Sequence, residues 1–486
     1  MEGYKHGAYV KEVNSTLAAP RRNETGLHVV FGTAPVNMAT EPEKAVNRLI
    51  MVNTYEEAVE KLGYSEDYGK YTLCQVMDAY FRLFAVGPVV FCNVLDPAKH
   101  KKDNMEKEYP VNNRQTVLEE TGILPSSLKV KMEDDTELVK DADYITSFDE
   151  TGKLTISLFT AGKGADAANL KVTSASVAPE MVTEADIIGG VDVETGKETG
   201  MELVRRVYPK CGWFPGYIMA PGWSHKKDVA AVMAAKCREI NGVFRCECLV
   251  DLDTEKAKRH TDCGKVKEEN GLVSASMIVL YPMVLAGGKK YYYSAVYGAM
   301  TAQTDADNDS VPSLSPSNRL LNVDGTVLAD GTEVDLDLPE ANALNGQGIV
   351  TVLNSGGMRS WGNNTAAYPD VSEVKDRWIN CRRAFSWWGN SFITICRENV
   401  DSPANYRLIE SIVDAENIRG NSYVQQGKFA GIRMEYNGQD NSVEDLLEGK
   451  IEVKQYLAPF TPAEYILNVL SFDPELLENS LGGGNS

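Results

Sequence analysis

The chain has 486 residues, of which 43% are hydrophobic, and a formal net charge of −20 at pH 7. This length exceeds the ~250–300 residues at which a single hydrophobic core stops growing, so at least two domains are expected. The negative charge argues against binding to nucleic acid or to an anionic membrane surface. No apolar run reaches the ~18 residues of a membrane span, and Met1 is followed by polar residues, which predicts a cytoplasmic product.

The first hundred residues predict an extended arm followed by an α/β unit. Residues 1–20 contain too little apolar surface to fold alone; Tyr9, Val10 and Val13 are apolar, and the segment ends at Pro20. Residues 21–102 then alternate between patterns typical of strands and of helices. We expect strands at 28–33 and 89–94, and helices at 55–62 and 72–86.

Residues 103–185 change to short alternating stretches, such as 128–132 and 154–158, separated by turn signals. This pattern predicts a small all-β module. The α/β pattern resumes over 186–353, with strands at 217–220, 243–250 and 276–280 and a polar loop at 304–348. The module is therefore predicted to be an insertion into a discontinuous α/β core domain, 21–102 and 186–353.

The C-terminal region, residues 354–462, is predicted to be a separate α+β domain. Ser402-Pro403 indicates the start of a helix, and an alternating pattern around Ile432 indicates a strand. A short acidic helix over 442–448 and a strand over 451–457 follow. The fold class is therefore α/β within a multidomain α+β chain.

The segment 463–472 near the C-terminus is apolar on both faces of a predicted strand. Tyr465, Leu467 and Val469 point one way under period-2 geometry, and Ile466, Leu470 and Phe472 point the other way. Such a strand needs cover on both faces and hydrogen-bond partners. It is either an ordinary central strand of its own sheet or, within a C-terminal arm of residues 463–486, a strand lent to a neighbouring chain.

The search for chemical motifs predicts no catalytic residue, cofactor or metal ion. The five histidines lack metal-ligand spacing, and Cys246-x-Cys248 falls on one strand face, where buried thiols are common. Asp305-x-Asp307-x-Asp309 lacks the glycine and glutamate of a calcium loop and is interpreted as a polar loop. The nine cysteines, an odd number, are expected to be reduced.

Several motifs carry a resemblance to a known family when they are taken in order along the chain. They are GAYVKE at 7–12, VMDAYFRLF at 76–84, AQTDA at 302–306, SPSN at 315–318, GGMRSWGNNT at 356–365, INCRR at 379–383 and the closing segment 449–466. In this order they resemble the contractile tail sheath proteins of bacteriophages, R-type bacteriocins and related contractile injection systems. Two positions depart from the family pattern: residues 291–295 replace a Pro-Pro-Ser-Gly stretch, and Asn364 replaces an arginine.

The resemblance implies a structural subunit and no enzyme. Sheath subunits stack as hexameric rings around a tail tube, lend terminal arms to neighbouring subunits, and contract to drive the tube through a target envelope. It implies these partners: further copies of the chain, the tail tube protein, and baseplate and tail terminator proteins, with neither nucleic acid nor a membrane bound directly. The location is the virion tail or a contractile particle assembled in the bacterial cytoplasm, with the module at 103–185 on the exterior.

The resemblance also assigns roles to particular residues. The arm contacts are Tyr9, Val10, Val13, Tyr465, Ile466, Leu467, Val469, Leu470 and Phe472, and the hinges are Pro20, Pro459 and Pro462. Glu444, Asp445 and Glu448 are expected to face a basic tube surface, or else to form a solvated acidic helix.

Two questions stay open from the sequence. The sheath could belong to an infectious phage, to a headless bacteriocin or to another injection system. A non-sheath α/β enzyme or binding protein is the remaining alternative, for which the strand ends offer only Asp251 as an acid.

Overall fold

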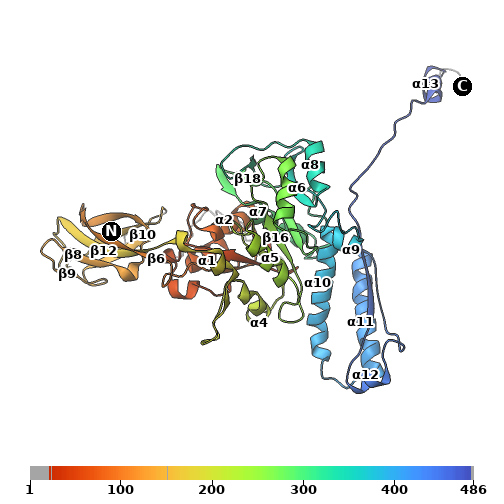
Figure 1. Cartoon of the computed structure of the whole chain (residues 1–486), viewed down its shortest axis with the longest axis horizontal. Helices are drawn as coiled ribbons and strands as arrows, with labels where there is room; N and C mark the ends of the chain where they lie inside the picture. The colour runs from red at the N-terminus through yellow and green to blue at the C-terminus, as the bar shows by residue number, and fades with distance from the viewer. Residues whose placement is uncertain (1–20, 23, 150, 483–486) are drawn as a thin grey trace, which may run out of the picture.

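The computed structural model describes residues 21–22, 24–149 and 151–482, and Figure 1 shows three regions in it. A central α/β body lies between a small β module and an elongated helical finger. We call the module residues 101–177 and the finger residues 379–459. The chain end extends from the finger side of the molecule as an isolated thread that ends in a helix.

An eight-stranded sheet forms the centre of the body, in the order β22-β21-β17-β16-β15-β2-β5-β3. Its strands are β2 (Leu27–Gly32), β3 (Ile50–Val52), β5 (Val89–Asn93), β15 (Pro215–Met219), β16 (Glu247–Asp251), β17 (Met277–Leu280), β21 (Ile349–Asn354) and β22 (Met358–Trp361). The six inner strands pair in parallel, and the two outer strands β3 and β22 are antiparallel to their neighbours. Because helices cover a parallel sheet, its strands are apolar and almost wholly buried.

The helices of the body connect these strands. They are α1 (Tyr55–Leu62), α2 (Thr72–Asp78), α3 (Glu184–Ile188), α4 (Val207–Cys211), α5 (Lys227–Lys236), α6 (His260–Glu269), α7 (Tyr293–Asp307) and α8 (Leu338–Asn345). The prediction for α1 is confirmed: Thr54 accepts a hydrogen bond from the Glu57 N–H, and Gly63 ends the helix at φ 74°. The second predicted helix continues from α2 as a single π turn, Ala79–Leu83.

The polar loop predicted at 304–348 is wrong, because this stretch begins within helix α7 and includes β20 (Gly325–Val327) and α8. Every residue of α7 from 293 to 302 is buried. A helix that is buried all round has no polar face, so its sequence lacks the amphipathic period that would predict it. Gly298 permits the close packing, since a Cβ there would lie 2.6 Å from the Tyr80 hydroxyl.

Short antiparallel pairs decorate the body. β18 (Met283–Ala286) pairs with β19 (Lys289–Tyr291) and β20, β13 (Gly190–Val191) pairs with β14 (Glu198–Thr199), and β1 (Arg21–Arg22) runs parallel to β4 (Val86–Gly87). The predicted strand 243–250 is observed only as β16, so Cys246 precedes the strand.

The module consists of two sheets around its own hydrophobic core, as expected for an all-β insertion. One sheet contains β6 (Lys101–Pro110), β12 (Asn169–Val177), β8 (Lys129–Met132) and β9 (Glu137–Leu138), and the other contains β10 (Tyr144–Phe148), β11 (Lys153–Leu158) and β7 (Gln115–Thr121). Its first and last strands, β6 and β12, pair with each other, so both connections to the body lie together.

The finger contains two long helices and a two-stranded sheet. These are α10 (Ile379–Cys396), α11 (Tyr406–Gln425), β23 (Phe429–Glu435), α12 (Val443–Leu447) and β24 (Lys454–Pro459), and the short helix α9 (Val374–Arg377) precedes them. Helix α11 begins after an Asn405 cap, so the start predicted at Ser402 is three residues too early. The predicted domain boundary between residues 353 and 354 falls within the β21-β22 hairpin. After its glycine-rich turn the chain pairs with β21 again, so residues up to 361 belong to the main sheet.

Candidate assembly interface

The apolar segment 463–472 has no strand partner among the residues that the structure describes. It leaves the molecule as an extended thread (Figure 1). Tyr465, Ile466 and Leu470 are 80%, 84% and 87% exposed, and Leu467, Val469 and Phe472 are also exposed. The interpretation as a central strand of its own sheet is therefore wrong for this chain. An exposed apolar stretch of this kind is typical of a segment that is buried against a partner.

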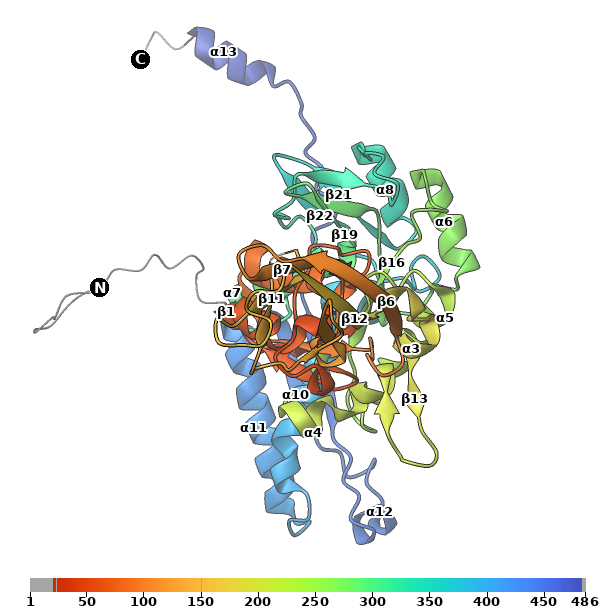
Figure 2. The same ribbon diagram turned by 90° about the vertical axis from the view of Figure 1, so that its left-hand side faces the viewer.

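Helix α13 (Pro474–Gly482) follows the thread and stands apart from all other elements (Figure 2). Leu476, Leu477 and Leu481 are exposed on it. An isolated helix of this length is marginal in water, and its leucines have no cover within the described chain. The exposed apolar surface thus continues beyond the segment that the sequence singled out.

The finger offers a sheet to which a strand can be added. β23 and β24 pair only with each other among the described residues, so the outer edge of each strand lacks a neighbouring strand, although the Asn417 side chain on α11 bonds both the N–H and the C=O of Met434 on β23. One face of this sheet packs on α11, where a Cβ on Gly420 would lie 2.7 Å from the Ile432 side chain. A two-stranded sheet is marginally stable, and additional strands stabilise it.

The predicted C-terminal hinge follows the last strand of the finger. Pro459 is the last residue of β24 and lies opposite Phe429 in the strand register. The Asn380 side chain donates a hydrogen bond of 2.9 Å to the Phe460 carbonyl. One side-chain hydrogen bond thus holds the backbone within the predicted hinge, and Pro462 lies against a pocket described below.

The other predicted arm residues cannot be placed. Tyr9, Val10, Val13 and Pro20 lie outside the described residues.

The predicted acidic helix is α12, at the far end of the finger (Figure 1). Ser442 caps it by accepting a hydrogen bond of 3.0 Å from the Asp445 N–H, and Lys450 pairs with Glu448 at 2.5 Å. Val443 and Leu447 on the same helix are 73% and 83% exposed. Sequence analysis missed this apolar component, although two apolar residues four positions apart share one helix face.

A buried network of charges joins the finger to the body. Arg383 on α10 donates from Nη1 to Oδ1 of Asp305 on α7 at 3.2 Å, and its second nitrogen contacts the other carboxylate oxygen. The Thr25 hydroxyl donates to the same carboxylate at 2.9 Å. Asp305 is therefore a buried partner of a cation, whereas the sequence placed it in a polar loop.

Glu247 and His28 lie close to this network. Burial raises the pKa of Glu247, although Arg382 and a hydrogen bond of 2.6 Å from Ser386 oppose that rise. Burial lowers the pKa of His28 to about 3, and the positive charge of Arg383 adds to that effect. His28 is thus a neutral core residue, bonded to the Tyr80 hydroxyl at 2.5 Å.

The carboxyl edge of the parallel sheet contains one buried acid, Asp251. It accepts hydrogen bonds from the Ser224 hydroxyl at 3.0 Å and from the Ser294 N–H at 2.8 Å and hydroxyl at 2.5 Å. Burial raises its pKa to about 6. Because Ser294 belongs to the first turn of α7, the carboxyl group caps that helix, which is a structural role.

The remaining candidates for chemical function are possible metal ligands and the cysteine thiols. Within the described part of the chain, no three His, Cys, Asp or Glu side chains gather as a metal site. The nine cysteines are free thiols, seven of them buried and two half-buried. Among the described helices, none is both long and apolar enough to span a membrane.

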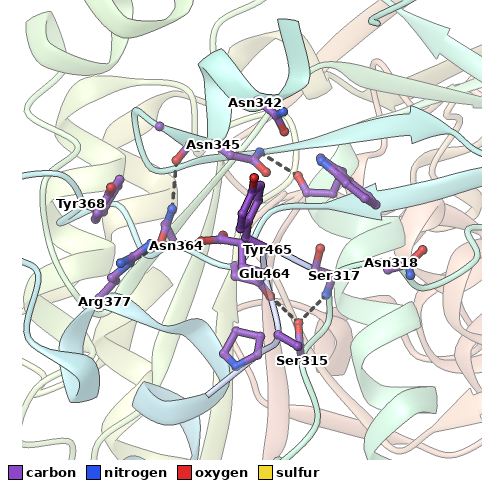
Figure 3. A pocket seen from close by; sticks show the side chains of 15 residues that line it. Ser315, Ser317, Asn318, Asn342, Asn345, Asn364, Tyr368, Arg377, Glu464 and Tyr465 are labelled. Carbon is purple, nitrogen blue, oxygen red and sulfur yellow. Dashed lines mark hydrogen bonds and ion pairs between the residues drawn. The ribbon is translucent and has the colours of Figure 1, made fainter. Parts of the chain in front are cut away.

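A pocket of about 550 Å³ lies where the arm leaves the body (Figure 3). Its walls come from the segment between α7 and β20, from α8, from the glycine-rich motif and from the arm itself. They include Ser315, Asn342, Asn345, Trp361, Asn364, Tyr368, Arg377, Glu464 and Tyr465. The glycine-rich motif and the arm, about a hundred residues apart in the chain, thus form one site.

Comparison with known proteins gives this geometry a context. No protein-family model matches the chain. The tail sheath protein of Burkholderia phage BcepMu is 26% identical over 500 aligned residues, which cover 99% of each chain. The tail sheath protein of Escherichia phage P2 is 22% identical and covers 63% of this chain and 74% of its own length.

The chain is similar along its whole length to a phage tail sheath protein. Solved structures of sheath assemblies have the same fold. The helical sheath of the anti-feeding prophage in its contracted state has a TM-score of 0.57 at 15% identity, covering 96% of this chain and 99% of its own. A sheath complex of an extracellular contractile injection system in its contracted state has a TM-score of 0.54 at 16% identity, covering 98% and 99%.

Proposed function

We propose that the chain is the structural subunit of a contractile tail sheath. It polymerises helically around a tail tube in a metastable extended state and contracts to drive the tube through a target cell envelope. One observation carries this proposal: within the described residues, a single chain has an apolar segment, 465–472, without a strand partner and a two-stranded sheet with open edges. The arm of one subunit supplies a strand to the sheet of the next, which pairs both sets of backbone groups.

The same arrangement accounts for contraction without loss of connectivity. Exchanged arms act as tethers while the subunits repack from the extended to the contracted lattice. The extended lattice is kinetically trapped and is released at the baseplate. Residues 1–20 act as a second arm, with Tyr9, Val10 and Val13 as contacts. The module projects from the outer surface, where its separate core does not interfere with the rings.

The tip of the finger faces the tube in this proposal. Glu444, Asp445 and Glu448 present negative charge to a basic tube surface, and Val443 and Leu447 supply apolar contact. The double substitution Glu444→Lys/Glu448→Lys should weaken cosedimentation with the tail tube protein, whereas Glu108→Lys on the exposed strand β6 should not. Asp445 is kept because it forms part of the helix cap. Equal tube binding by both variants would contradict this orientation.

The proposed partners are further copies of the chain, the tail tube protein, the baseplate and the tail terminator. The particle is a phage tail or a contractile injection device assembled in the bacterial cytoplasm. Capsid and terminase genes beside the sheath gene would favour a phage; their absence would favour a bacteriocin or an injection system.

The decisive experiment compares the full chain with a variant truncated after Pro462. Electron microscopy of the full chain, with tail tube protein added, should show striated tubes or stacked rings. The truncated variant should stay monomeric while keeping its melting temperature, because the arm side chains are exposed. If the truncated variant assembles equally well, the arm is not the connector; if it fails to fold, the arm is part of the subunit's own core.

A further inference from the structure

The arm is held at two successive points before it becomes free. Asn380 donates to the Phe460 carbonyl at 2.9 Å, and Nη2 of Arg377 donates to Oε2 of Glu464 at 3.0 Å. From Tyr465 to Phe472, in contrast, no hydrogen bond or ion pair ties the described chain to the body. The transition from a tethered to a free backbone thus falls between 464 and 465.

Arg377 is itself rigidly held. Its guanidinium lies 3.9 Å from the centre of the Trp378 ring and 4.6 Å from that of Tyr368. Its Nε donates to Asn364 Oδ1 at 2.9 Å, and the Asn364 amide donates to the Asn345 carbonyl at 3.0 Å. Arg377 is therefore fixed by aromatic stacking and by the glycine-rich motif before it meets the arm.

The loop that carries Tyr368 is also held in place by hydrogen bonds. The Lys267 amino group donates to the carbonyls of Gln347 at 2.5 Å and Tyr368 at 3.0 Å. Burial lowers the pKa of Lys267 to about 8. The Tyr368 loop, which supports one side of the guanidinium, is thus tied to α6 and to the turn that follows α8.

We propose that Arg377 is a positioning residue for strand donation: by clamping Glu464 it sets the direction in which the arm leaves the subunit, and the pivot lies at Tyr465. The inference rests on the proposed function and refines it, because it moves the hinge beyond Pro459 and Pro462. A fixed exit direction presents the arm to a neighbouring sheet with less loss of conformational freedom on pairing. The open pocket beside Tyr465 gives the arm room to swing about this pivot.

The test measures distances between spin labels on the full chain, kept dilute and unassembled. Cys211 and Cys396, the two half-buried thiols, are first replaced by serine. One label pair joins exposed Ala343 on α8 to Ala463, inside the tethered stretch, and a second pair joins Ala343 to Val469, beyond the pivot. The width of each distance distribution reports how freely that part of the arm moves.

We expect a narrow distribution for 343/463 and a broad one for 343/469. Glu464→Ala should abolish the narrow distribution at 463. Lys375→Ala should leave it intact, because Lys375 lies on the same short helix but pairs with Glu373 and Asp376 instead of the arm. A broad 343/463 distribution in the parent chain, or a narrow one that persists in Glu464→Ala, overturns the proposal.

A charge exchange separates clamping from a merely structural role. Arg377→Glu should broaden the 343/463 distribution, and Arg377→Glu/Glu464→Arg should narrow it again. A double variant that stays as broad as Arg377→Glu contradicts the clamp. Since these distances are measured on single subunits, failure of the clamp is visible there, whereas failure of the proposed function appears as a parent chain that never assembles on tube protein.

Discussion

Arg383 and Asp305 show how much one pair of residues contributes to the joint between finger and body. The two side chains are 6% and 1% exposed, and Arg383 also lies 5.1 Å from the centre of the Tyr217 ring. Such a pair is costly to bury but far costlier to break, because the remaining charge keeps no partner. The joint between α10 and α7 therefore depends on both members.

Arg383→Met is expected to reduce the free energy of unfolding by about 3–5 kcal/mol, because it leaves the buried Asp305 carboxylate without its cationic partner. Urea denaturation followed by circular dichroism measures the change. Lys44→Ala, which breaks an exposed pair with Glu41, is the matched control and should have little effect. Arg383→Met/Asp305→Leu should recover part of the loss; a double variant less stable than the single one would contradict this explanation.

Asp251 predicts a specific dependence of stability on pH. Its pKa rises from an ordinary value of 3.8 to about 6 in the folded chain. Between these values the unfolded chain releases the proton while the folded chain retains it, so the folded state loses stability as the pH rises from about 4 to about 6. The loss is on the order of 3 kcal/mol and stays constant above that range.

Asp251→Asn removes this titration while keeping polar atoms for Ser224 and Ser294. Relative to the parent chain, the variant should gain on the order of 3 kcal/mol between about pH 4 and about pH 7. Denaturation curves for both proteins across this range give the difference, in which the other titrating groups cancel. A difference that does not vary with pH would show that Asp251 has an unperturbed pKa.

Secondary-structure elements that are specified by local sequence signals could be predicted, whereas features that depend on tertiary contacts could not. The cap at Thr54 and the glycine at 63 act within one helix, so the sequence alone predicted α1. Helix α7 was missed because a helix that is buried on all sides has no periodic alternation of apolar and polar residues. Asp305 appeared to belong to a loop because its partner, Arg383, lies 78 positions away in the sequence.

The same distinction between local pattern and tertiary contact applies to the arm and to the residues that hold it. The period-2 pattern of 463–472 predicted a strand with two apolar faces, but a strand needs a partner, and the chain on its own contains none for it within the described residues. Arg377 and Glu464 are separated by 87 positions, and neither belongs to a motif that would pair them. The candidate arm was thus predictable from local pattern, whereas its clamp required the structure.

The module offers a test at this scale. Lys102 of β6 lies opposite Ser176 of β12, so a short Asn-Gly turn can join them in place of residues 103–175. The shortened chain should fold with a small loss of stability, since Leu124 in the deleted part contacts the main core. Calorimetry measures the loss, and electron microscopy with tube protein should still show assembly. An unfolded or non-assembling product would show that the module is not an independent insertion.

For the whole molecule, the net charge of −20 opposes the approach of identical subunits. Salt shortens the screening length from about 30 Å at 10 mM to about 8 Å at 150 mM, which weakens this repulsion. Assembly on tube protein, followed by light scattering, should therefore be faster at the higher salt concentration. Slower assembly would mean that complementary charges on the contacting surfaces outweigh the net repulsion.

In the proposed assembly, exchange of the arm onto the open-edged sheet also gives a growing sheath two unlike ends. A subunit that gives its arm in one direction and receives one from the other leaves unfilled sheet edges at one terminus and unspent apolar arms at the opposite terminus. The filament is therefore polar, and its two terminal rings need caps of different chemistry: a strand donor at one end and a strand acceptor, or an apolar cover, at the other.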